Sequence, residues 1–319
     1  MTRPDDSSLN PEDRRFVEDR AKRLLDRADA WGRFPTQVDD IMAAAELKVA
    51  AVSVFDPASL LSFLKEKGSH TAHILKAAVA KILGVYDGDE RTVHIDPGVV
   101  ATKQTFLKLH EAGHHELPAH RKMFRFFQDC EKTLHPDIAD QFEREANNFA
   151  RFVLFQGSTF GEMAADEKLG IRSPIKLAEH FGASIYASVR EFTRTSRHAC
   201  LAYALEPMEY VPIDGYRAVI RRIEASPSFS LRFGLPTGSV ITQRDALGPL
   251  LPIGRKMTKP TAFAMSDRNG ESQEMIGEAF STKYNIFILI YAVASLARPA
   301  IIGRPAAPAS TWPRQPGLG

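Results

Sequence analysis

Two histidines one helical turn apart are the feature that most restricts what this chain can fold into. They lie in the segment His110-Glu111-Ala112-Gly113-His114, within a pattern that predicts a helix from Asp96-Pro97 to about Glu116. Residues four apart on a helix project from the same face, so both imidazoles can reach one zinc ion. Glu111 lies beside that face, where it can hold an attacking water and take its proton.

A catalytic zinc site also needs a third protein ligand and one open position. His120 is one candidate, ten residues after His110 as in the metzincin motif, but Leu117 stands where that motif has glycine. Glu145 is the other candidate, on a predicted helix with a continuous apolar face that can pack against the motif helix. We predict Glu145 as the third ligand and keep His120 as the alternative.

The predicted site is therefore one Zn²⁺ per chain held by His110, His114 and Glu145, with Glu111 as the catalytic base. Glu143 is expected on the exposed face of its helix, paired with Arg144 or Arg151. Asn147 or Asn148 can orient a ligand imidazole, although an ordinary position on the protein surface explains either residue equally well.

Composition favours a soluble, cytoplasmic protein. Of 319 residues, 41 are basic and 39 acidic, so the formal net charge of +2 gives no indication of a polyanionic partner. Cys130 and Cys200 cannot form a disulfide framework and fit a reducing compartment. The longest uncharged apolar run, residues 285–297, is too short to span a bilayer and is typical of a buried strand.

Shifts in composition predict an α+β chain of several units. We expect a flexible N-terminus over residues 1–10, a metal-binding domain over 11–160 and a helical unit over 161–207. A mixed α/β domain follows over 208–297, and residues 298–319 are expected to be disordered because they are rich in Pro, Ala and Gly.

Local signals place several elements within these units. Helices are expected to start at Asn10-Pro11 and at Thr36, and to cover residues 136–155. Residues 82–95 predict a hairpin with a turn at Asp87-Gly88-Asp89. Further helices are expected at 56–68, 70–81 and 120–133, a strand at 49–55, and four short strands at 210–213, 239–242, 261–265 and 287–293.

Residues 173–194 have the pattern of a helix-turn-helix, with Gly182 at the turn and Ser184 capping the second helix. That second helix would present Tyr186, Ser188, Arg190 and Arg194. Its few basic residues favour a structural or substrate-positioning use over contact with DNA.

At the motif residues the chain resembles the ImmA/IrrE family of zinc metallopeptidases. The stretches that carry the resemblance are Phe106-Leu107-Lys108-Leu109-His110-Glu111-Ala112-Gly113-His114, Glu145-Ala146-Asn147-Asn148-Phe149-Ala150, the hairpin at 84–93 and the short helix within 35–49. The similarity extends over about residues 13–160, and less strongly over 170–205. The family's usual Leu-Leu-Met-Pro ending is Val153-Leu154-Phe155-Gln156 here.

The resemblance implies a small gluzincin-like, or zincin-like, fold whose ligands carry over to His110, His114 and Glu145, with Glu111 as the base. It implies a C-terminal sensor domain of GAF type. It also implies a protein substrate, a helix-turn-helix repressor, whose cleavage switches on stress-response or mobile-element genes. Two alternatives stay open: a regulator that binds a repressor without cutting it, and a DNA-binding regulator that uses residues 173–194.

Overall fold

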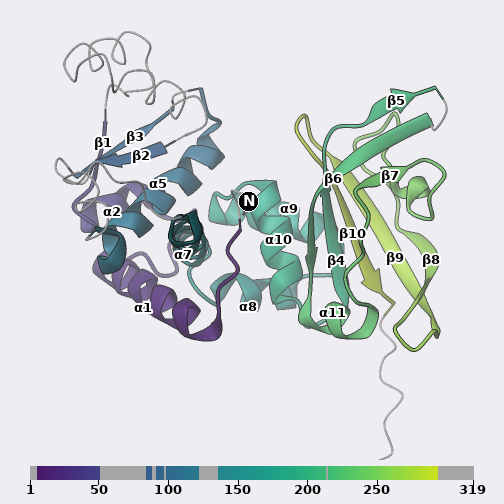
Figure 1. Cartoon of the computed structure of the whole chain (residues 1–319), viewed down its shortest axis with the longest axis horizontal. Coiled ribbons are helices and arrows are strands. Elements are labelled where there is room, and N and C mark those ends of the chain that lie inside the picture. The colour runs from purple at the N-terminus through teal and green to yellow at the C-terminus, as the bar shows by residue number, and fades with distance from the viewer. Residues whose placement is uncertain are drawn as a thin grey trace, which may run out of the picture.

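The computed structural model describes residues 6–50, 84–87, 91–96, 98–121, 136–212 and 215–293. In Figure 1 a mixed lobe with a small sheet lies on one side and a large, curled antiparallel sheet lies on the other. A group of helices lies between them. The expected α+β architecture, a zincin-like domain followed by a C-terminal α/β domain, is confirmed.

In its described residues, the first lobe combines three strands with four helices. Helix α1 (Pro11–Arg27) is followed by α2 (Val38–Ala44), β1 (Lys48–Val49), β2 (Gly84–Asp87), β3 (Thr92–Ile95), α5 (Ala101–Glu116) and α7 (Pro136–Leu154). The sheet order is β1-β3-β2, with β1 parallel and β2 antiparallel to β3. Helix α5 packs against β2, β3 and, most extensively, α7.

Three helices connect the lobes: α8 (Thr159–Asp166), α9 (Arg172–Phe181) and α10 (Ile185–Thr195). Gly182 ends α9 in the left-handed conformation (φ 67°), and the Ser184 side chain accepts a hydrogen bond from the Ala187 backbone at the start of α10. Both agree with the predicted helix-turn-helix pattern.

The large sheet contains β4 (Cys200–Leu205), β5 (Glu209–Val211), β6 (Gly215–Ala225), β7 (Val240–Thr242), β8 (Thr261–Ser266), β9 (Ser272–Ser281) and β10 (Ile286–Ala292). Its order is β5-β6-β4-β10-β9-β8, with β7 also paired to β6, and its pairs are antiparallel. Helix α11 (Pro227–Phe233) and the 3₁₀ turn η1 (Gly248–Leu250) lie beside it. Because β4 pairs with β6 and β10, this sheet begins before residue 208, where we expected the C-terminal domain to start.

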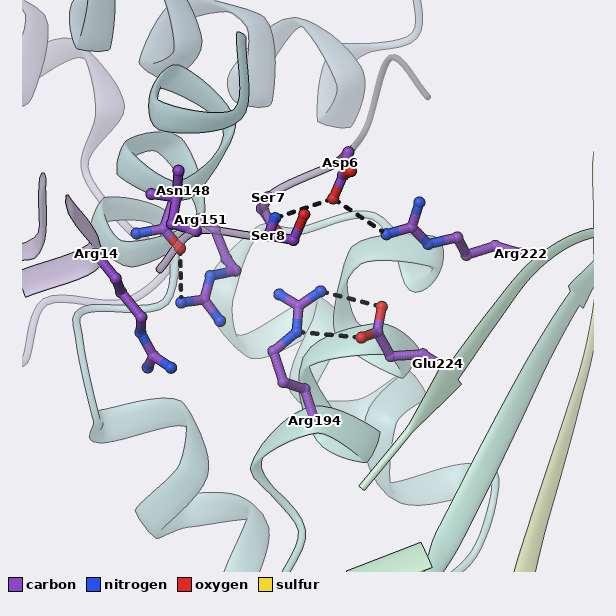
Figure 2. Close-up of a pocket in the computed structure, with 10 residues that line it drawn as sticks. Asp6, Ser7, Ser8, Arg14, Asn148, Arg151, Arg194, Arg222 and Glu224 are labelled. Atoms are coloured by element: carbon purple, nitrogen blue, oxygen red, sulfur yellow. Dashed lines mark hydrogen bonds and ion pairs between the residues drawn. The ribbon is translucent and has the colours of Figure 1, made fainter. Parts of the chain in front are cut away.

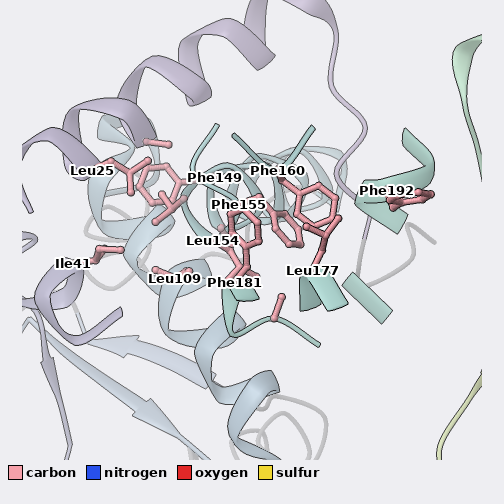
Figure 3. Packing of buried hydrophobic residues seen from close by; sticks show 14 of the residues in the cluster. Leu25, Ile41, Leu109, Phe149, Leu154, Phe155, Phe160, Leu177, Phe181 and Phe192 are labelled. Carbon is pink, nitrogen blue, oxygen red and sulfur yellow. The ribbon is translucent and has the colours of Figure 1, made fainter. Parts of the chain in front are cut away.

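Both faces of this sheet are covered. Cys200, Ala202 and Ala204 belong to the core shared with the helices, whereas Leu201, Tyr203 and Leu205 belong to a second core on the opposite face. Side chains alternate between faces along a strand, so six consecutive buried residues require cover on both sides. The first core extends across α1, α5, α7, α9 and α10, and Figure 3 shows its aromatic centre.

Several predicted boundaries are confirmed. The Asn10 side chain accepts hydrogen bonds from the Glu12 and Asp13 backbones at the start of α1, and α5 ends at Glu116. Thr36, in contrast, does not cap α2. Its hydroxyl donates to the Leu154 carbonyl instead, so a tertiary contact replaces the local one.

Some expectations lie outside the described residues: the helices at 56–68 and 70–81, most of that at 120–133, the strand beyond Val49, the start of the N-terminus and the tail at 298–319. Among the helices that are described, none combines the length and the hydropathy needed to cross a bilayer.

Candidate metal centre

The crossing of α5 and α7 brings the motif histidines against the second helix. A Cβ atom on Gly113 would lie 3.2 Å from both the Ala146 Cα and the Phe149 Cβ. Such contacts are tighter than packed side chains normally make, so glycine at this motif position allows the two backbones to approach closely. Phe149 is fully buried at the crossing. The close approach is what places residues of α7 within reach of His110 and His114.

Three side chains converge at this crossing. The Nε2 atoms of His110 and His114 are 3.2 Å apart. One carboxylate oxygen of Glu143 lies 3.3 Å from the His110 Nε2, and the other lies 3.6 Å from the His114 Nε2. Within the described parts of the chain, this is the one group of three possible metal ligands whose donor atoms all lie within 4.8 Å of one another.

The Nδ1 of His110, which faces away from the cluster, belongs to a chain of hydrogen bonds. The His110 Nδ1 is 3.0 Å from the Asn147 Oδ1, and the Asn147 Nδ2 donates to the Asp6 carbonyl at 2.8 Å. Because the Asp6 carbonyl can only accept, the amide oxygen must face His110, which makes the His110 Nδ1 the donor. The lone pair of this ring is therefore on Nε2, toward the cluster.

A similar chain orients His114. Its Nδ1 is 2.9 Å from the Nδ1 of the fully buried His120, and the His120 Nε2 is 2.9 Å from a Glu145 oxygen. In a neutral His120 whose Nε2 donates to Glu145, the Nδ1 accepts from His114. The second Glu145 oxygen accepts from Gln141 at 2.8 Å. The acceptor nitrogen of His114 is thus also Nε2.

These residues fit a zinc ion. Two imidazole lone pairs that face each other at 3.2 Å repel unless a cation or proton lies between them. Zinc bonds of about 2.0–2.2 Å in a tetrahedron separate neighbouring ligand atoms by roughly 3.3 Å, which is close to the spacings of this cluster. Two nitrogens and one carboxylate also match the donor set of catalytic zinc sites.

Electrostatics favour the protonation states that a metal requires at His114 and Glu143, whereas the carboxyl groups near His110 favour its charged form. Burial lowers the pKa of His114 to about 4 and so keeps the ring neutral. Burial alone would raise the pKa of Glu143, but the imidazoles of His110 and His114 beside its oxygens hold it far below its ordinary value. Burial would lower the pKa of His110, yet the neighbouring carboxyl groups of Glu143 and Glu111 raise it.

Glu111 is the buried carboxyl beside the cluster. Burial raises its pKa to about 7, Glu143 adds to this rise, and His110 opposes it. A carboxyl poised near neutral pH can accept and release a proton at modest cost, which suits an acid-base role.

The three predicted ligands do not all meet in the structure. His110 and His114 meet as expected, but the carboxylate that joins them is that of Glu143, whereas Glu145 bonds His120. The expectation that Glu143 pairs with Arg144 or Arg151 is wrong: its side chain is half exposed, yet its oxygens lie on the imidazoles. His120 does not join the cluster; it contacts the Nδ1 of His114, on the side of the ring away from the cluster.

Side chains of the helix-turn-helix unit make contacts within the fold. Helix α10 packs on β4 and β6. Arg190 and Arg194 both contact Glu224 of β6 at 3.0 Å, and the buried Ser188 donates to the Pro174 carbonyl. This geometry favours a structural use of the unit, because these side chains already have partners in the fold.

A comparison with known protein families matches one part of the chain. A family model described as the IrrE N-terminal-like domain matches residues 68–191, which include the motif, Glu143 and Glu145. No curated protein matches the sequence significantly. A solved structure of a Mycobacterium tuberculosis transcriptional regulator is similar over 87% of this chain and 76% of its own, with 12% identity and a TM-score of 0.49.

Proposed function

Because residues 68–191 match the family model of the IrrE N-terminal-like domain, we propose that the protein is a zinc-dependent endopeptidase of the ImmA/IrrE type that acts in regulation. The observation that carries the proposal is the cluster of His110 Nε2, His114 Nε2 and the Glu143 carboxylate, with the spacing of three zinc ligands. We take Glu143 as the third ligand in preference to Glu145.

The contacts within the site indicate a separate role for each residue. Bound zinc would polarise the scissile carbonyl and lower the pKa of a water. Glu111 accepts the proton of that water and passes it to the leaving amine. Asn147 and His120 keep the ligand rings in the required tautomer. The half-exposed Glu143 side chain marks the side from which solvent and substrate reach the cluster.

The substrate is proposed to be a helix-turn-helix repressor, bound in an extended conformation. Among the strands that the structure describes, β2 lies at an edge of the small sheet, and α5 packs against it. An unpaired strand edge can add a peptide through backbone hydrogen bonds, which would present its carbonyls beside the motif helix. Hydrogen exchange should slow at residues 84–87 when substrate binds, and unchanged exchange there would count against this docking mode.

The test is a search for new N-termini. Lysate proteins would be incubated with the zinc-loaded wild type and with Glu111→Gln, and new amino termini identified by mass spectrometry. We expect cleavage products only with the wild type, among them fragments of a repressor. Identical sets from both proteins would refute the peptidase proposal and favour a regulator that binds without cutting.

A further inference from the structure

A second polar site lies on the other side of α7 from the motif helix. Residues 6–9, here called the N-terminal strap, run between the two lobes and border a pocket of about 210 Å³. Figure 2 shows four arginines around it from four different elements: Arg14 of α1, Arg151 of α7, Arg194 of α10 and Arg222 of β6. Like charges are brought together here although they repel.

The carboxylates nearby do not match these cations one to one. Glu224 is shared by Arg190 and Arg194, Glu191 by Arg151 and Arg194, and Glu18 by Arg14 and Arg151. Asp6 lies 3.8 Å from Arg222, beyond hydrogen-bond distance. Among the described residues, five guanidinium groups are thus gathered around four carboxylates.

Two buried hydrogen-bond donors at the pocket lack a partner. The Arg151 Nε and the Asn148 Nδ2 are buried and have no hydrogen-bond partner, and the hydroxyl-bearing Ser7 and Ser8 line the same pocket. Guanidinium groups bind phosphate and carboxylate oxygens in pairs, and such charge-assisted bonds are among the strongest in proteins. A cluster of arginines beside buried donor atoms that lack a partner, those of Arg151 and Asn148, is therefore suited to an oxyanion.

We propose that this pocket binds a small organic anion through a phosphate or carboxylate group. The anion would bridge Arg222 of the large sheet and the guanidinium groups of Arg14 and Arg194 on the helices. At roughly 30 Å³ per water molecule, the pocket has the volume of about seven waters. That space accommodates one such group together with a few carbon atoms.

The pocket is connected to the candidate metal centre. Asp6 lies near Arg222 through its side chain, and its carbonyl accepts the hydrogen bond of Asn147, which holds His110. An anion that draws Arg222 from Asp6 would act on the strap that supports this ligand ring. The binding itself does not require the chain to be a peptidase, so the two proposals can fail separately.

The experiment measures binding of inorganic phosphate and of malonate to the full chain by titration calorimetry, against chloride at equal ionic strength. Arg222→Gln and Arg14→Gln remove two pocket cations. Arg217→Gln is the matched control, because Arg217 also lies on β6 but pairs with Glu209 outside the pocket. Circular dichroism verifies that each variant is folded.

We expect saturable binding of at least one anion by the wild type and by Arg217→Gln, weakened about tenfold or more in Arg222→Gln and Arg14→Gln. Preference for phosphate or for malonate then identifies the group that is recognised. If Arg222→Gln does not fold, Arg14→Gln decides alone, since Arg14 is 54% exposed and tolerates substitution. Equal affinities in all four proteins, or no saturable binding by either anion, would overturn the proposal.

Discussion

Alanine substitution of the two candidate acids on α7 separates their roles. Glu143 contacts both Nε2 atoms of the imidazole pair, whereas Glu145 reaches His114 only through His120. Both residues lie on the same helix and alanine is compatible with it, so Glu143→Ala and Glu145→Ala are matched variants.

The expected losses differ in size. Structural zinc sites with four ligands bind with about 10–16 kcal/mol, or roughly 3 kcal/mol per ligand, so loss of Glu143 should weaken zinc binding about a hundredfold or more. Glu145→Ala removes a partner of an orienting histidine, for which tenfold is a typical loss and about a hundredfold the upper end.

The assay is zinc affinity at pH 7.5 by competition with a chromophoric chelator, with elemental analysis of metal per chain. Absorption spectra of the cobalt-substituted protein provide a second readout, because they respond to the ligand set. Glu143→Ala should change the cobalt spectrum, and Glu145→Ala should preserve it. The reasoning is refuted if Glu145→Ala abolishes zinc binding and alters the spectrum while Glu143→Ala leaves both intact.

Four further outcomes follow from the site. Glu111→Gln should retain zinc by elemental analysis and lose about 10²–10⁴-fold in cleavage rate. In the metal-free protein, the raised pKa of Glu111 means that this residue binds more protons in the folded than in the unfolded state between about pH 4.5 and 7; the stability of the wild type relative to Glu111→Gln, measured by urea unfolding, should therefore fall by about 3 kcal/mol as pH rises through that window. Asn147→Ala should weaken zinc binding about 10–100-fold, while its neighbour Asn148→Ala, whose amide contacts Arg151, should leave the affinity unchanged. Gly113→Ala should lower the melting temperature despite the higher helix propensity of alanine, because its Cβ would meet the Ala146 backbone; a rise would show that α5 and α7 can separate at little cost.

Short sequence patterns predicted correctly those elements whose ends are set by contacts between residues close together in the chain. The Asn10-Pro11 pair starts α1 because the cap is formed within three residues, and Gly182 ends α9 through its left-handed backbone. Strands β2 and β3 likewise pair antiparallel, as expected for two short stretches so close together in the chain, although the predicted turn at Asp87-Gly88-Asp89 lies mostly outside the described residues. In each case the side chains that determine the element are its own neighbours.

Strands buried on both faces were harder to recognise. The β4 sequence Cys-Leu-Ala-Tyr-Ala-Leu is uniformly apolar because one face meets the helices and the other meets the second core. Without alternation, such a run cannot be distinguished from a buried helical segment by periodicity. Its assignment depends on β6 and β10, which arrive from later in the chain.

The choice between Glu143 and Glu145 shows what spacing along a sequence leaves undetermined. Two residues apart on a helix, these side chains project about 200° from each other, so only one can face the motif helix. From the sequence we interpreted Glu145 as the ligand and Glu143 as a solvated acid. One available signal was the interval from Glu143 to Asn147: residues four apart share a face, so a ligand carboxylate and an amide that orients a ligand ring would both reach the same imidazole. The structure has this arrangement, with Glu143 on the Nε2 of His110 and Asn147 on its Nδ1. A third ligand is therefore better sought together with the residue that supports its neighbours than by its distance from the motif.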